Sequence, residues 1–383
     1  MYERSRTLPD SPERTRLYDA QAAQQPQFRD YQNNTDRVIP VITITRACGT
    51  GLDALITVAN KIAVGQIEAG IGGGSDTTSD VPIAVSKKLR RRLLDLNRAR
   101  SLGERIKAAL KGFSFGEFKP EFPGVAEPRT GKSMGESCED MAKQWQIRRE
   151  DQDLLAYESH QKAAAAYARG FYSDLVMPLR GLDKDNILRP DTTLEKLATL
   201  KPAFDKRSGN GTLTAGNSTN LSDGASAALL SSEAWAQANG KEIQAYLVDA
   251  QVAAVDFVAG EGLLMAPAWA VAQLLKRNNL KLQDFDFYEI HEAFAAQVLC
   301  TLKAWESEEF CKTKLGRDKP LGSIDRSKLN VVGSSLAMGH PFAATGARIV
   351  ATAAKLLKEK GSGRVLISVC TAGGMGVAAI VER

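Results

Sequence analysis

Residues 45–55 read TRACGTGLDAL, and they join a β-branched run to an amphipathic pattern. The run before them, residues 37–44, is rich in valine and isoleucine and is typical of a buried strand. After them, apolar residues recur at three- and four-residue spacing from Leu52 to Ile62, which predicts a helix. Cys48 is therefore expected at a helix N-terminus, where unpaired N–H groups and the helix dipole favour a thiolate. A reactive nucleophile and an inert buried cysteine both fit this position.

The same order of elements returns near the end of the chain. After Gly51 come the predicted helix, a short apolar run and a glycine-rich turn at 72–74. After Gly346 come another helix, a strand at 365–369 and a turn at 370–374. These matching orders form a weak internal repeat, which predicts two similar α/β halves.

The other segments divide around this repeat. Residues 1–36 are polar without a clear period and predict an irregular leader. The charged, helix-prone segment 87–202 is interpreted as a domain inserted into the first half, which then comprises 37–86 and 203–237. The second half is 238–383. Further predicted elements are a helix at 150–167, a helix at 225–230, a strand at 245–258, a helix at 269–275, a strand at 285–290 and a helix at 292–302.

Composition narrows the class of protein. A chain of 383 residues can bury a large core. Its five cysteines are scattered and lack C-x-x-C spacing, which argues against a disulfide framework and a structural zinc site. No apolar run reaches the roughly 20 residues that span a bilayer, and the first residues lack an apolar signal region. A cytoplasmic protein is predicted, in which single cysteines are candidate catalytic residues.

The net charge of +5 is modest, but basic residues gather in one segment. Residues 87–111 contain ten lysines and arginines against only Asp95 and Glu104. A solvated helical face explains this segment as well as a surface for coenzyme phosphates, an anionic membrane or an acidic partner does. It lacks the interleaved aromatic residues that stack on nucleic-acid bases, so no nucleic-acid partner is predicted.

Three other candidate catalytic residues lie where a predicted strand ends or a predicted helix begins. His340 lies in a glycine-proline turn before the second-half helix, His291 ends a predicted strand, and Cys370 ends the last buried strand beside small residues. His160 lies in a charged helical stretch and is expected at the surface. A thiolate needs a base, an acyl group needs oxyanion donors, and a second substrate needs its own proton acceptor. Cys48, His340, His291 and Cys370 offer a candidate for each role.

At these residues the sequence resembles the thiolases, the acetyl-CoA acyltransferases, and within them the branch found in fatty-acid β-oxidation complexes. The resemblance covers roughly residues 38–383 and implies a duplicated five-layer α-β-α-β-α fold with an inserted loop domain. The motifs that carry it are TRACGTGLDAL around Cys48, GNSTNLSDGASAALL from Gly216, HEAFAAQ from His291, SLAMGHPFAATGARIV from Ser335 and SVCTAGGMGVAAIVE from Ser368.

The resemblance implies ping-pong acyl transfer in fatty-acid metabolism and lipid degradation. Cys48, activated by His340, would take the acyl chain of a 3-ketoacyl-CoA as a thioester. Cys370 would protonate the departing acetyl-CoA enolate and then activate the incoming CoA. His340 and a water held by His291 would form one oxyanion hole, and the N–H groups of Cys48 and Ala372 the other. Many thiolases carry asparagine in place of His291, and the histidine is typical of the β-oxidation-complex branch.

The resemblance also implies substrates and partners. Met134, Thr219 and Phe294 match positions that line the pantetheine channel, with ordinary packing as the other interpretation of each. Coenzyme A and acyl-CoA are then substrates, and no permanently bound cofactor or metal is expected. A homodimer or higher oligomer, a hydratase/dehydrogenase subunit of a β-oxidation complex and peripheral membrane contact are the implied partners.

One feature departs from the family pattern. Thiolases carry a strand-helix-strand unit with an Arg-Thr-Pro motif before the nucleophile strand, whereas residues 1–36 contain only the poor match Arg6-Thr7-Leu8-Pro9. The first unit is therefore predicted to be missing. Three alternatives stay open beside the β-oxidation enzyme: an acetoacetyl-CoA-forming acetyl-CoA acetyltransferase, a truncated non-catalytic remnant that binds a complex partner, and coenzyme A sequestration without turnover. A ketoacyl synthase of the same superfamily would lack Cys370.

Overall fold

The computed structural model describes residues 6–8, 41–43 and 46–383. In the first two of these ranges, β1 (Arg6–Leu8) pairs antiparallel with β2 (Val41–Thr43). The strand predicted at 37–44 is thus found over Val41–Thr43, and the rest of that prediction lies outside the described residues. The predicted leader likewise lies almost wholly outside them.

The second half of the chain is built on a four-stranded sheet with the strand order β7-β10-β9-β8. β8 runs parallel to β9, and β10 pairs antiparallel with both β9 and β7. Almost every residue of β9 and β10 is buried, as expected for central strands covered on both faces. The strands are β7 (Tyr246–Ala254), β8 (Phe287–Ile290), β9 (Arg364–Thr371) and β10 (Met375–Glu382).

Helices cover this sheet and carry the main hydrophobic core. α10 packs against β7 and β10, and its N-terminal proline occupies a position where a missing N–H is harmless. The helix predicted at 292–302 is confirmed but begins three residues later, after an extended segment at His291–Phe294. The helices of this half are α10 (Ala266–Arg277), α11 (Ala295–Glu306), α12 (Glu308–Thr313), α13 (Ser335–Met338) and α14 (Ala343–Lys360).

The first half contains α3 (Thr50–Ala63), α9 (Glu233–Ala238) and a two-stranded sheet of β3 (Ala69–Asp76) and β6 (Gly224–Ser231). Two predictions are wrong here. Residues 72–74 lie within β3 rather than in a turn, and residues 225–230 form β6 rather than a helix. The register pairs Gly73 with Ala227, and small residues are needed because a Cβ at Gly73 would meet the backbone of that partner strand.

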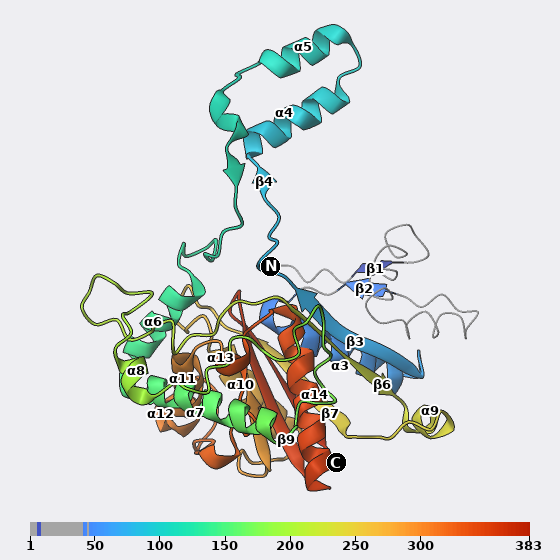
Figure 1. Cartoon of the computed structure of the whole chain (residues 1–383), viewed down its shortest axis with the longest axis vertical. Helices are drawn as coiled ribbons and strands as arrows, with labels where there is room; N and C mark the ends of the chain where they lie inside the picture. The colour runs from blue at the N-terminus through green and yellow to red at the C-terminus, as the bar shows by residue number, and fades with distance from the viewer. Residues whose placement is uncertain (1–5, 9–40, 44–45) are drawn as a thin grey trace.

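α14 joins the two halves, because it contacts α3, β3 and β6 on one side and β9 on the other (Figure 1). Two glycines allow α3 and α14 to cross closely. A Cβ at Gly51 would meet the backbone of Ala343, and a Cβ at Gly346 would meet the backbone of Leu52. The helix that begins after Cys48 and the helix that begins after His340 are therefore in direct backbone contact.

The segment predicted as an insertion has two parts. α4 and α5 form a hairpin that stands away from the rest of the chain, and neither helix has a buried residue (Figure 1). The other helices pack on the body, with α6 against α11 and α7 against α11 and α13. The elements are β4 (Ala84–Val85), α4 (Lys87–Arg98), α5 (Leu102–Leu110), β5 (Pro120–Glu121), α6 (Met134–Gln144), α7 (Arg149–Ala168) and α8 (Leu194–Ala198).

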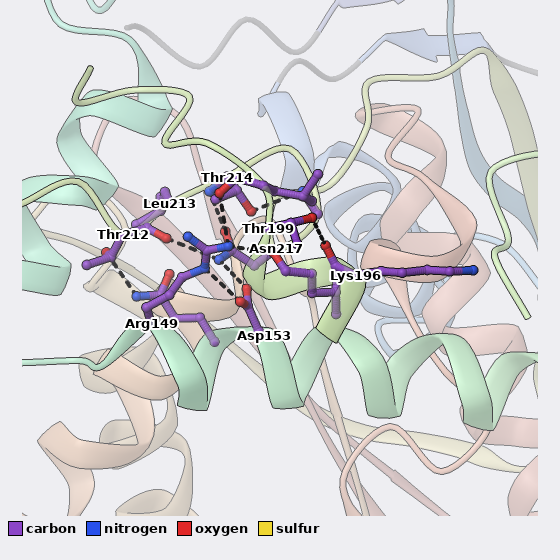
Figure 2. A network of polar contacts seen from close by, with 12 residues as sticks. Arg149, Asp153, Lys196, Thr199, Thr212, Leu213, Thr214 and Asn217 are labelled. Atoms are coloured by element: carbon purple, nitrogen blue, oxygen red, sulfur yellow. Dashed lines mark hydrogen bonds and ion pairs between the residues drawn. The ribbon is translucent and has the colours of Figure 1, made fainter. Parts of the chain in front are cut away.

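A polar network fastens α7 to the loop that leads into β6 (Figure 2). Arg149 donates to Asp153 at 2.7 Å, and the other oxygen of Asp153 accepts from the Asn217 amide at 2.9 Å. The Asn217 side-chain oxygen in turn accepts from the backbone N–H of Thr214 at 2.7 Å. Asp153 and Asn217 are buried, so each bond replaces lost hydration. The network fixes the loop that carries Thr219.

No helix among the described residues is long and apolar enough to cross a membrane. The limits predicted for the leader, the two halves and the insertion stay predictions, and so does the missing first unit.

Candidate active site

Three of the predicted residues meet at one buried point between the two halves. The Nε2 atom of His340 lies 2.9 Å from the Sγ atom of Cys48, and the rings of His291 and His340 have centroids 4.3 Å apart. Cys370 is the last residue but one of β9, which packs against the short 3₁₀ turn that holds Cys48. All four side chains are at most 6% exposed. Residues up to 322 positions apart in sequence thus form one cluster.

Local hydrogen bonds hold Cys48 at the start of α3. The 3₁₀ turn Ala47–Gly49 contains Cys48, and Ala47 has a positive φ of 43°. The Thr50 hydroxyl donates to the Ala47 carbonyl at 2.7 Å and accepts from the Arg46 N–H at 2.8 Å. The Arg46 guanidinium also pairs with the buried Asp53 in the first turn of the helix at 3.0 Å. These contacts fix the direction in which the sulfur points.

Burial, rather than the helix N-terminus, has the largest effect on the pKa of Cys48. The N–H groups of Ala372 and of Cys48 itself lower the pKa of the thiol, but burial outweighs them and raises it to about 12. Burial and the positive charge of Arg348 lower the pKa of His340 to about 3. The backbone N–H of Cys48 at the start of the helix acts in the expected direction, but burial has the larger effect on the pKa of the thiol. The resting pair is a neutral thiol and a neutral imidazole.

The loop before α14 orients His340. Its Nδ1 atom lies 2.7 Å from the Thr345 hydroxyl, and its backbone N–H donates to the Asn220 carbonyl at 2.9 Å. Gly339 has a φ of 80°, and Phe342 has a φ of 23°, a conformation that L side chains rarely adopt. For Nε2 to accept the Cys48 proton, Nδ1 must carry the ring proton and Thr345 must accept it.

His291 follows β8 and lies beside His340. Its Nδ1 atom is 2.8 Å from the Ser335 hydroxyl, and its backbone N–H donates to Ser368 at 2.8 Å. Its buried Nε2 atom has no hydrogen-bond partner among the described residues. Burial and the nearby His340 and Arg348 hold the pKa of His291 well below its usual range, so the ring is neutral. A neutral ring with an unpartnered nitrogen is available to a substrate or a water.

Glu292, which the sequence analysis did not single out, fixes the loop around these histidines. Its carboxylate accepts from the Ser159 hydroxyl at 2.7 Å, from the Asn330 amide at 2.7 Å and from the Leu336 N–H at 3.2 Å. Burial nevertheless raises its pKa. Ser159 belongs to α7, so this carboxylate joins the inserted segment to the histidine loops. Only its place in the HEAFAAQ motif pointed to it.

The turn after Cys370 approaches the same sulfur. Burial and the neighbouring Cys48 raise the pKa of the Cys370 thiol. Gly373 and Gly374 have φ values of 78° and 72°, and the carboxylate of Glu127 accepts from the Gly373 N–H at 2.7 Å. Because Glu127 lies 246 positions away, no local pattern predicts this contact. The inserted segment thus contacts the turn that aims the Ala372 N–H at Cys48.

The three residues predicted to line the pantetheine channel surround this cluster in different ways. Met134 begins α6 and is partly buried against the main core. The Thr219 hydroxyl donates to the Ser335 carbonyl at 2.6 Å, which brings Thr219 to the histidine loops. Phe294 is buried with its ring centroid 5.7 Å from that of Phe204. Contact of these residues with coenzyme A stays a prediction.

Two further expectations concern single residues. His160 is buried on α7 rather than exposed, because its Nδ1 atom accepts from the Arg189 N–H at 3.2 Å in the inserted segment. The five cysteines are all free thiols, as predicted from their spacing.

The chain matches known family models along most of its length. Residues 30–234 match the model described as "Thiolase, N-terminal domain", and residues 241–383 match "Thiolase, C-terminal domain". The chain belongs to the thiolase family. The predicted family and acyltransferase class are confirmed.

Relatives and solved structures agree with this thiolase assignment. The chain is 45% identical over 346 residues to proteins named 3-ketoacyl-CoA thiolase from Shewanella sp. (strain W3-18-1) and Shewanella sediminis (strain HAW-EB3), covering 89% of this chain and 78% of each relative. The crystal structure of human mitochondrial 3-ketoacyl-CoA thiolase superposes with a TM-score of 0.71 at 28% identity, covering 88% of this chain and 77% of that one.

Two other solved structures extend the comparison. The Bacillus anthracis acetyl-CoA acetyltransferase has a TM-score of 0.69 at 32% identity, covering 88% of this chain and 77% of that one. The human mitochondrial enzyme in complex with CoA has a TM-score of 0.70 at 28% identity, covering 88% and 76% of the two chains. The predicted thiolase fold is therefore confirmed.

Proposed function

We propose that this thiolase is a 3-ketoacyl-CoA thiolase that works by ping-pong acyl transfer through Cys48. The observation that carries the proposal is the 2.9 Å contact between Cys48 Sγ and His340 Nε2 inside a buried cluster. The names of the Shewanella relatives support the substrate class. A CoA complex of a structural neighbour supports coenzyme A as a substrate.

In the first half-reaction, His340 takes the thiol proton of Cys48 as the sulfur attacks the keto carbon of the substrate. The C–S bond forms while the carbonyl oxygen becomes an oxyanion, which N–H donors stabilise. The carbon–carbon bond to the α-carbon then breaks. Its electron pair leaves with acetyl-CoA as an enolate, and Cys370 supplies the proton that completes acetyl-CoA. Cys48 retains the acyl group as a thioester.

In the second half-reaction, the Cys370 thiolate removes the proton from the thiol of free coenzyme A. The new thiolate attacks the acyl-thioester, and the N–H groups of Cys48 and Ala372 receive the second oxyanion. The Cys48 thiolate leaves and regains its proton from His340. The interaction of both N–H groups with the Cys48 sulfur supports this role, since donors beside the sulfur are close to the carbonyl oxygen of an acyl group bound to it.

The resting protonation states also support the mechanism. Because the pKa of the thiol is raised and that of the imidazole is lowered, both groups are neutral in the buried site before substrate binds. The proton moves only when an oxyanion develops to accompany the new imidazolium. Transition-state binding of this kind raises kcat rather than substrate affinity alone.

We also propose that the chain forms a soluble homodimer or higher oligomer in the cytoplasm. It acts there with a hydratase/dehydrogenase subunit. Coenzyme A and acyl-CoA act as substrates rather than as resident cofactors. The exposed hairpin of α4 and α5 supports contact with an acidic partner or an anionic membrane surface, because its basic residues have solvent-facing positions.

A thiolysis assay across 3-ketoacyl-CoA chain lengths from four to sixteen carbons, about a dozen substrates at most, tests the proposal. We expect turnover of medium or long chains and a loss of at least about 10⁴-fold in Cys48→Ala. Turnover of acetoacetyl-CoA alone would favour the acetyltransferase alternative. Absence of thiolysis at every length in a cooperatively folded protein would favour a non-catalytic chain.

A further inference from the structure

Ser335 and Arg348 form a chain of hydrogen bonds behind His291. The Arg348 Nη2 group donates to the Ser335 Oγ atom at 2.8 Å, and Oγ lies 2.8 Å from His291 Nδ1. Ser335 and His291 are completely buried, and Arg348 is partly buried on α14. We propose that Ser335 and Arg348 are positioning residues that hold His291 in the tautomer with its proton on Nε2. This inference rests on the proposed thiolase reaction.

The available donors and acceptors determine which atom donates in each of these hydrogen bonds. A guanidinium can only donate, so Ser335 Oγ accepts from Arg348. The Ser335 hydroxyl has one proton, and His291 Nδ1 is its only nearby acceptor among the described residues. If Nδ1 carried a proton instead, the buried hydroxyl proton would have no acceptor, at a penalty of about 1–3 kcal/mol. Donation from Ser335 to Nδ1 places the ring proton on Nε2.

The charge of Arg348 favours the same state of the ring. It lowers the pKa of both His291 and His340, and burial acts in the same direction. Arg348 lowers the pKa of the buried carboxyl of Glu289, but burial outweighs this effect and raises that pKa to about 8. An imidazolium at position 291 would therefore meet an uncompensated positive charge. His291 stays neutral with one N–H.

The rest of the loop keeps Ser335 in place. Its carbonyl accepts from the Thr219 hydroxyl at 2.6 Å, and the next residue, Leu336, donates its N–H to Glu292. Ser335 also begins α13, which packs against α7. The hydroxyl that orients His291 is thus held by the first half, the second half and the inserted segment together.

The consequence for the reaction is a defined donor in the site. His291 Nε2 is buried without a partner among the described residues, and one ring nitrogen of His291, one of His340 and the Cys48 Sγ atom all lie within 4.8 Å of one another. As an N–H donor, Nε2 can bind a water or the substrate oxygen where negative charge develops. As an unprotonated nitrogen it could accept a hydrogen bond from a water but could not donate one to such an oxygen. Ser335 and Arg348 therefore act on catalysis through His291 without contacting the substrate.

Nitrogen-15 NMR of histidine-labelled protein reads the tautomer directly, because the chain has only three histidines. His160→Gln and His340→Asn variants assign the signals. In the neutral ring, Nε2 couples to both carbon-bound ring protons and Nδ1 mainly to one, so the protonated nitrogen is identified without an activity measurement. We expect the Nε2–H tautomer of His291 in the unmodified protein. A predominant Nδ1–H tautomer would overturn the proposal even if thiolysis is normal.

Kinetics of three variants complete the test. Ser335→Ala removes the donor to His291, and Arg348→Met removes the charge and the donor to Ser335. Ser368→Ala is the matched control, because Ser368 is buried next to His291 and its hydroxyl has no partner among the described residues. We expect kcat to fall about 10- to 100-fold in the first two variants, with little change in KM, and to stay within about twofold in the control.

The NMR signal separates positioning from damage to the fold. In Ser335→Ala we expect a mixture of His291 tautomers, and in Ser335→Thr, which keeps the hydroxyl, we expect the Nε2–H tautomer and at least half of kcat to return. An unchanged tautomer in Ser335→Ala would overturn the proposal whether or not kcat falls. Absence of thiolysis in the unmodified protein, with the Nε2–H tautomer present and lost in Ser335→Ala, would count against the proposed function alone.

Discussion

The close crossing of α3 and α14 predicts how a single methyl group should affect the enzyme. In Gly346→Ala the added Cβ would lie 2.8 Å from the Leu52 Cβ and 3.0 Å from its Cα. Carbon atoms in contact lie about 3.5–4.0 Å apart, so the two helices must separate by about 1 Å. Because Cys48 precedes one helix and His340 the other, the contact between Sγ and Nε2 must lengthen with them.

Two effects of this substitution have opposite signs. Overpacking against backbone atoms destabilises by about 1–3 kcal/mol, whereas alanine gains about 1 kcal/mol over glycine in a helix interior. We expect a net loss of up to about 2 kcal/mol in the free energy of unfolding. A misplacement of about 1 Å also predicts a fall of about 100-fold in kcat/KM.

Urea unfolding and a thiolysis assay measure both effects. Gly103→Ala is the matched control, because Gly103 lies within α5 and a Cβ there meets nothing within 4 Å. The control should gain about 0.5–1 kcal/mol in the free energy of unfolding and keep its kcat/KM. A Gly346→Ala enzyme with unchanged stability and unchanged kcat/KM would refute the reasoning.

Three further predictions concern single groups. Cys370→Ala should lose at least about 100-fold in thiolysis, because its sulfur acts as acid in one half-reaction and as base in the other, and unchanged thiolysis would contradict its role. Glu127→Ala should lower kcat about 10-fold while Glu127→Gln, which keeps an acceptor for the Gly373 N–H, stays near the unmodified rate; equal rates in both variants would exclude this contact from catalysis. Burial lowers the pKa of His160 in the folded chain from 6.5 to about 4, so the unfolded chain binds more protons in that range. The stability of the unmodified protein should therefore fall relative to His160→Gln by up to about 1.4 kcal/mol per pH unit between pH 6.5 and 4 in urea titrations, and a pH-independent difference would contradict a neutral buried His160.

Much of the fold could be predicted from hydrophobic spacing. The buried strands β8 and β9 and the helices α3, α10 and α14 have clear apolar patterns, and each occurs where the sequence predicts it. α7 also occurs where it is predicted, although its apolar residues are spread around the helix rather than gathered on one face. The sequence does not predict β3 and β6 as strands, because they consist mostly of glycine, alanine and serine. Such residues have little hydrophobic contrast, so their conformation is decided by close packing against other elements.

The site shows a similar division. Cys48, His340, His291 and Cys370 each lie at a strand end or helix start, where short local patterns identify candidates. The groups that control them come from distant parts of the chain, as Glu127 does for the turn after Cys370. Their protonation also depends on burial, which the position of Cys48 at a helix start could not reveal.

The most direct test of the central claim is to trap the acyl group on the enzyme. The protein is mixed with a 3-ketoacyl-CoA without free coenzyme A, quenched in acid and analysed by peptide mass spectrometry. We predict one acyl group in thioester linkage on Cys48, removed by hydroxylamine and absent in Cys48→Ala. An acyl group on Cys370 or on another residue, or turnover with no acyl-enzyme and full activity in Cys48→Ala, would contradict the account.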